Sequence, residues 1–218
     1  MKIFKNKRKL QREIIKIKNI SFVPTMGSIH KGHEKLINIA KRRFKKVLVS
    51  IYVNPKQFNS RDDFRSYPRN IKKDINALKR LKVDYLYIPN YSDVFFFKPK
   101  KQIYLHSFSK KLCGKLRKGH FKGVINVINR FLEIIKPKYM LLGKKDFQQL
   151  YLIKKHIEKN KIPTIVIPCK TVRNKNGTAL SSRNNNLKKD ELIKLAKIIK
   201  KIKKSKKSIN KSKILKIL

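Results

Sequence analysis

The chain has 218 residues, of which 40% are apolar, so it is long enough to bury the core of one large domain or two small ones. Its 59 Lys and Arg residues outnumber 12 Asp and Glu residues, which gives a formal net charge of +47. No segment approaches the roughly 20 consecutive apolar residues of a membrane span. The basic N-terminus (1–18) also lacks the apolar stretch of a signal peptide. These features argue against a membrane protein and predict a soluble, cytoplasmic one.

The net charge is of a size that is typical of nucleic-acid-binding proteins, and it predicts salt-dependent attraction to polyanions. The basic residues are mostly lysines spread along the whole chain, among many Ile and Asn residues rather than in Arg-Gly or Arg-aromatic clusters. AT-rich coding produces such a bias at exposed positions without a selected partner. We therefore expect nonspecific nucleic-acid binding only. A basic protein that binds nucleic acid as its function remains the alternative.

Short apolar runs alternate with helical patterns along the chain. The Ile and Leu spacing at 10, 14, 15 and 17 predicts a surface helix. The predicted strands are 22–23, 47–53, 85–88, 139–142 and 164–167, and the predicted helices are 70–82, 123–135 and 147–158. This alternation predicts an α/β fold with a parallel sheet covered by helices on both faces. Ligands of such folds bind at the carboxyl ends of the strands.

The segment TMGSIHKGH (25–33) follows the first predicted strand and precedes an amphipathic stretch. Gly27 and Gly32 allow the backbone to approach a ligand, and the start of the helix offers N–H groups to anionic oxygens. His30 and His33 add donors that titrate near neutral pH. Segments 54–58 and 143–149 also follow predicted strands. We expect these three loops to converge on one phosphate-binding cleft.

A second motif, ALSSR (179–183), lies far downstream. A His-x-Gly-His turn paired with a distant Ser-Ser-basic loop is similar to the nucleotidyl-transfer signature of enzymes that form acyl adenylates from ATP. Between these two motifs, VSIYVNPKQF (49–58), YPR (67–69), GHFKGV (119–124) and GKKDFQQ (143–149) occur in that order. Together the motifs resemble the pantothenate synthetase (pantoate-beta-alanine ligase) family, from about Ser21 to Asn186.

The resemblance implies an ATP-dependent, AMP-forming carbon-nitrogen ligase with two steps. The carboxylate of pantoate attacks the α-phosphate of ATP and releases pyrophosphate, and β-alanine then attacks the pantoyl adenylate. It also implies a Rossmann-like domain that binds ATP and pantoate (1–171), followed by a segment that carries the Ser-Ser-Arg loop (172–218). A homodimer and Mg²⁺ carried by ATP are further implications.

The resemblance also implies a function for individual residues. His33 matches a proton donor, and His30, Lys145 and Arg183 would face the phosphates. Gln57 and Gln149 match residues that hold pantoate, and Met26 would contact it. The expected ATP-binding residues are Met26, Gly27, His30, Gly32, His33, Gly143, Lys145, Asp146, Val172, Leu180, Ser181, Ser182 and Arg183. The residues expected to be structural are His106, His120, His156 and the thiols Cys113 and Cys169, which should be buried or half-buried.

The chain departs from the family pattern at three places. Lys144 stands where an acidic residue is usual, at a position that we expect to be peripheral. The acidic run after YPR retains only Asp74, so we expect the phosphates of ATP to hold Mg²⁺, with Asp74 as the lesser candidate for a metal ligand. After residue 184, where relatives continue into a small closing domain, we expect a basic amphipathic helix and a stretch (203–213) too charged to pack alone. This shortened lid predicts an active enzyme that loses adenylate to hydrolysis.

Overall fold

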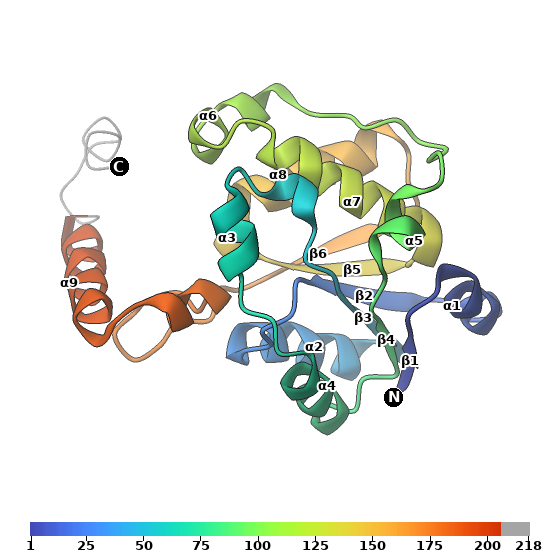
Figure 1. The fold of residues 1–218 in the computed structure, drawn as a ribbon, viewed down its shortest axis with the longest axis horizontal. Coiled ribbons are helices and arrows are strands. Elements are labelled where there is room, and N and C mark those ends of the chain that lie inside the picture. Colours follow the sequence, from blue (N-terminus) through green and yellow to red (C-terminus); the bar gives the residue numbers. More distant parts are fainter. Residues whose placement is uncertain (206–218) are drawn as a thin grey trace.

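A parallel six-stranded sheet with helices on both faces forms the body of the computed structural model, which describes residues 1–205 (Figure 1). The strands are β1 (Lys2–Phe4), β2 (Ile20–Thr25), β3 (Lys46–Ile51), β4 (Tyr85–Tyr87), β5 (Tyr139–Gly143) and β6 (Ile165–Cys169). Every pair of neighbours in the order β1-β4-β3-β2-β5-β6 is parallel. The predicted α/β fold is confirmed.

The strand order reverses its direction at β2. From β2 the chain builds outward through β3 and β4, and it then crosses to the other side of β2 to form β5 and β6. β2 and β5 are therefore neighbours whose following loops leave in opposite directions. A crevice forms at the carboxyl ends of two such strands, and this is where open α/β sheets bind ligands.

Alternating side chains of the strands pack into two separate cores. Phe22, Leu48 and Met140 point to one face, whereas Val23 and Leu141 point to the other. The helices are α1 (Lys7–Ile14), α2 (Lys31–Arg43), α3 (Arg61–Ser66), α4 (Ile71–Arg80), α5 (Tyr91–Phe95), α6 (Cys113–Leu116), α7 (His120–Ile135), α8 (Phe147–Lys159) and α9 (Lys189–Ser205). The first face is covered by α1, α7 and α8, and the second by α2 and α4 (Figure 1).

The predicted elements agree with the structure to within a few residues at each end. The five predicted strands correspond to β2–β6, and the helices predicted at 70–82, 123–135 and 147–158 correspond to α4, α7 and α8. The N-terminal surface helix is α1, which buries Leu10 and Ile14 and leaves Ile15 exposed. Sequence analysis missed β1, since three residues with a largely exposed pattern carry no periodic signal. Its partner, the edge of β4, is more than 80 residues away in the chain.

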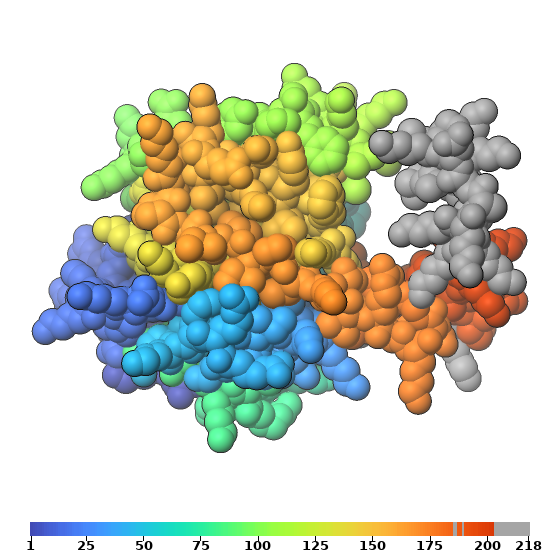
Figure 2. Space-filling model, turned by 180° about the vertical axis from the view of Figure 1, so that it is seen from behind, coloured from blue at the N-terminus to red at the C-terminus, as the bar shows by residue number. Residues whose placement is uncertain are grey.

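The segment after β6 leaves the body of the molecule and ends in α9 (Figures 1 and 2). The predicted basic helix is confirmed as α9, and its better-covered positions follow a helical spacing: Leu192, Leu195, Ala196 and Ile199. Most of the stretch expected to be too charged to pack, 206–213, lies outside the described residues. Within residues 1–205, no helix is long and apolar enough to cross a membrane.

Candidate active site

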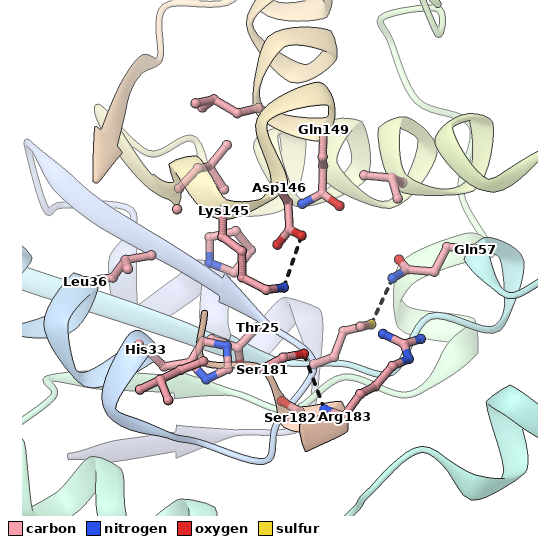
Figure 3. Close-up of a pocket in the computed structure, with 18 of the residues that line it drawn as sticks. Thr25, His33, Leu36, Gln57, Lys145, Asp146, Gln149, Ser181, Ser182 and Arg183 are labelled. Carbon is pink, nitrogen blue, oxygen red and sulfur yellow. Dashed lines mark hydrogen bonds and ion pairs between the residues drawn. The ribbon is translucent and has the colours of Figure 1, made fainter. Parts of the chain in front are cut away.

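A cavity of about 270 Å³ opens at the carboxyl ends of β2 and β5, where the strand order reverses (Figure 3). Nearly all of the predicted site residues line this cavity. They are Met26, His30, Gly32, His33, Gln57, Gly143, Lys145, Asp146, Gln149, Val172, Leu180, Ser181, Ser182 and Arg183. Gly27 and Asp74 do not line it. Gly27 lies in the turn that follows β2, and Asp74 is hydrogen-bonded to that turn. The fold thus brings segments from five parts of the chain to one place.

The turn that follows β2 has a left-handed backbone at Gly27 (φ 82°) and Ser28 (φ 51°). Asp74, a buried residue of α4, holds this turn, because its carboxylate accepts hydrogen bonds from the amides of Ser28 (2.8 Å) and Ile29 (2.7 Å). A Cβ at residue 27 would lie 2.9 Å from Oδ2 of Asp74, so the contact also requires glycine.

Asp74 was also predicted as the lesser candidate for a metal ligand, because of its position after the YPR motif. Both of its oxygens accept hydrogen bonds from backbone amides, and Asp74 does not line the cavity. Among the described residues, no group of three or more His, Cys, Asp or Glu side chains is arranged to hold a metal ion. The metal assignment stays a prediction, and the structure shows Asp74 as the cap of the turn that carries the two histidines.

The histidines stand at the start of α2. His30 is the N-cap residue, and its Nδ1 accepts a hydrogen bond from the amide of Gly32 at 3.0 Å. A side chain at residue 32 would collide with the His30 ring, at 2.7 Å from Cε1. The rings of His30 and His33 stack with their centroids 4.1 Å apart. The spacing His-x-Gly-His thus places the two rings against each other and leaves residue 32 without a side chain that would collide with His30.

Both imidazoles are held neutral at pH 7. Burial lowers the pKa of His33 to about 3, and the neighbouring His30 and Lys145 contribute. Burial also lowers the pKa of His30, followed by the charge of Lys145. Nδ1 of His33 is buried and has no hydrogen-bond partner among the described residues. An anion placed against this pair would offset the burial and favour the protonated form.

Several cations line the same cavity as the histidines. Lys145 lies in a 3₁₀ turn, η3 (Lys144–Asp146), directly after β5, and its Nζ is 3.2 Å from Oδ1 of Asp146. Arg117, Lys170 and Arg183 also line the cavity, and Asp146 is the one carboxylate among the described lining residues. The excess of positive charge in a concave site suits a substrate that carries several negative charges.

The other side of the cavity combines amides with apolar side chains. Gln57 lies in η1 (Pro55–Gln57), where its Nε2 contacts Sδ of Met26 at 2.9 Å and its Oε1 accepts from Nδ2 of Asn54 at 3.2 Å. Gln149 faces the cavity from α8 (Figure 3). Apolar residues, mostly of α7, form the adjoining wall: Tyr52, Val124, Val127, Ile128 and Phe131. Amides beside an apolar wall suit a small branched acid with hydroxyl groups.

Sequence analysis did not assign this wall to the site. The motif GHFKGV was recognised, but the spacing of apolar residues in α7 does not show which of them face the cavity rather than the core. Arg117 was missed because it belongs to no motif. His120 was expected to order a loop, and its contacts fit this prediction, since Nδ1 is 2.6 Å from the carbonyl oxygen of Gln57 and Nε2 is 3.1 Å from Arg117. His120 also lines the cavity.

The remaining residues that were expected to be structural lie outside the cavity. His106 caps η2 (Ser107–Lys110), and His156 is fully buried and bonded to Asn129. Cys169 is buried as expected. The prediction for Cys113 was wrong, because it begins α6, a four-residue helix that buries none of its side chains.

Comparison with known proteins agrees with this geometry. Residues 2–217 match the family model described as Pantoate-beta-alanine ligase. The chain belongs to this family. It is 44% identical over 177 residues to a bifunctional pantoate ligase/cytidylate kinase of Prochlorococcus marinus, an alignment that covers 79% of this chain and 35% of the relative. It is 39% identical over 184 residues to a pantothenate synthetase of Pseudothermotoga lettingae, which covers 84% of this chain and 66% of the relative. The chain thus spans about a third and about two thirds of these two relatives.

Solved structures of the family share the fold. A pantoate-beta-alanine ligase from Francisella tularensis, complexed with beta-gamma ATP and beta-alanine, superposes with a TM-score of 0.91 at 37% identity. That comparison covers 100% of this chain and 85% of the other. The family resemblance and the nucleotidyltransferase-like fold are thereby confirmed. These matches give no support to the nucleic-acid-binding alternative.

Proposed function

We propose that the chain catalyses the ATP-dependent condensation of pantoate with β-alanine to form pantothenate, through a pantoyl adenylate. The observation that carries this proposal is the composition of the cavity at the carboxyl ends of β2 and β5. Two stacked imidazoles and Lys145 line one part of the cavity. Gln57 and Gln149 lie beside an apolar wall in another part, and Arg183 lies on the side of Gln57 (Figure 3). An anionic nucleotide and a small hydroxy acid would meet between these two parts.

In the first step, a carboxylate oxygen of pantoate attacks the α-phosphorus of ATP, and the bond to the departing pyrophosphate breaks. The phosphates of ATP would lie against His30, His33 and the amides at the start of α2. Lys145 and Arg183 would offset the negative charge of these phosphates. Phosphates beside His33 raise its pKa, because the nearby charge is opposite to that of an imidazolium. His33 would then donate a hydrogen bond or a proton to the leaving group.

In the second step, the amine of β-alanine attacks the carbonyl carbon of the mixed anhydride, and AMP leaves. Gln57 and Gln149 would hold the hydroxyl and carboxylate groups of pantoate in position for both steps. Met26 would contact pantoate, Asp146 the ribose, and Ser181 and Ser182 would supply hydroxyl and backbone donors.

The metal and the assembly belong to the same proposal. The donors in the cavity do not fit a metal site built by the protein, since Asp146, the carboxylate among them, is paired with Lys145. Mg²⁺ would therefore arrive with ATP, whose phosphate oxygens are its preferred ligands. We also propose a cytoplasmic homodimer in which residues 1–171 bind ATP and pantoate, and 172–218 supply the Ser-Ser-Arg loop.

The test is ATP–pyrophosphate exchange with purified protein, Mg²⁺ and pantoate, followed by addition of β-alanine and detection of pantothenate. We expect exchange that depends on pantoate, that is lost in His33→Ala, and that is retained in the control His106→Ala, which alters a histidine outside the cavity. No exchange from folded wild-type protein would refute the proposed activity. Exchange without pantothenate would restrict it to the first step.

A further inference from the structure

Arg183 forms an ion pair with Asp63, a residue 120 positions earlier in the chain. Nη2 of Arg183 lies 3.1 Å from Oδ1 and 3.0 Å from Oδ2 of Asp63, and Nε lies 3.2 Å from Oδ1. The pair joins α3 to η4 (Ser182–Asn186), and Arg183 itself lines the cavity. No sequence motif singles out Asp63.

The pair fixes the guanidinium in a defined orientation. Asp63 occupies the edge formed by Nε and Nη2, so the N–H groups of Nη1 remain for another acceptor. The guanidinium carbon also lies 5.4 Å from the ring centre of Tyr67 and 6.0 Å from that of Phe58. Figure 3 shows Arg183 at the edge of the cavity, on the side of Gln57.

The carboxylate has an electrostatic effect as well. Arg117 and Arg183 both line the cavity. Burial lowers the pKa of Arg117 and the positive charge of Arg183 lowers it further, whereas the carboxylate of Asp63 raises it. Asp63 therefore offsets part of the charge of Arg183 at Arg117. Without Asp63, a long side chain at the surface would sample several rotamers and move away from Arg117.

We propose that Asp63 is a positioning residue that holds Arg183 by one edge so that its free N–H groups face the phosphates of ATP. This inference rests on the proposed function, because it takes ATP as the ligand of the cavity. Asp63 itself does not touch substrate. It acts through Arg183, and this dependence can be measured.

The experiment measures the affinity of the full chain for Mg-ATP and for adenosine by calorimetry. Asp63→Ala should weaken ATP binding about five-fold, the size expected for losing one favourable bidentate pair near the surface. Adenosine binding should not change, since adenosine has no phosphates. Asp62→Ala, which removes the neighbouring carboxylate of the same helix, is the matched control and should bind both ligands like wild type.

A double-mutant cycle separates positioning from a merely structural effect. Arg183→Ala should weaken ATP binding more than Asp63→Ala does, and the double variant should match Arg183→Ala. The proposal is overturned if Asp63→Ala binds ATP as well as or better than wild type, or if it causes the same loss in the Arg183→Ala background. Wild-type protein that binds ATP but shows no pantoate-dependent exchange would refute the proposed function instead, and would leave this test intact.

Discussion

Replacing Asp74 with Asn tests whether the turn beneath the histidines depends on two carboxylate bonds. Asp74 is 3% exposed and accepts from two amides, Ser28 N and Ile29 N. Asn keeps the shape but replaces one acceptor oxygen with an NH₂ donor, so one buried amide is left facing a donor. A hydrogen bond to a charged group contributes about 1.5–3 kcal/mol, and an unsatisfied buried donor costs a similar amount. We expect the free energy of unfolding to fall by about 2–3 kcal/mol.

Urea unfolding at pH 7 measures this loss, with Asp62→Asn as the control. Both variants change the net charge equally, but Asp62 is exposed and its change should stay within about 0.5 kcal/mol. ATP affinity should fall in Asp74→Asn alone, since the turn positions His30 and His33. Equal losses of stability in the two variants would show that charge, and not the buried bonds, sets the effect.

Three further predictions follow from single contacts. A Cβ at Gly123 would collide with the carbonyl oxygen of Lys56. Gly123→Ala should therefore destabilise the fold by about 1–3 kcal/mol, and an unchanged urea midpoint would contradict this. Burial lowers the pKa of His156 to about 4, so the unfolded chain takes up a proton first as pH falls. This group should therefore lower the free energy of unfolding by about 1.4 kcal/mol for each pH unit from 6.5 down to 4. Because His33 contributes a slope of the same sign, His156→Gln should reduce the measured slope by about this amount, and identical slopes would oppose the prediction. Cys113 is exposed and should react rapidly with a thiol reagent. Cys169 is buried, which also raises its pKa, and it should react only when the protein unfolds. Equal reaction rates of the two thiols would contradict this prediction.

The fold was predictable to a large extent because its signals are local. Apolar runs of strand length and helical spacing identified five of the strands and the helices α4, α7 and α8. The rule that ligands bind at the carboxyl ends of parallel strands then predicted that the loops after β2, β3 and β5 converge. β1 was not predicted, because its three residues are recognisable as a strand only through their pairing with β4.

The site was predictable where a motif carries its own geometry. In His-x-Gly-His, the cap of His30 on Gly32 and the stacking on His33 involve residues within one turn of a helix. The contacts of Asp74 with the turn and of Asp63 with Arg183 could not be predicted, because they join residues 45 and 120 positions apart in the chain.

The sequence by itself determined the family, the α/β class and most of the residues that line the cavity, because these depend on short segments whose conformation is set by neighbouring residues. Only the tertiary structure decided which strands are adjacent, which face of α7 forms the wall of the cavity, and which carboxylates hold the turn and Arg183. Those features depend on contacts between distant segments, and such contacts exist only once the sheet has been assembled and the helices have packed against it.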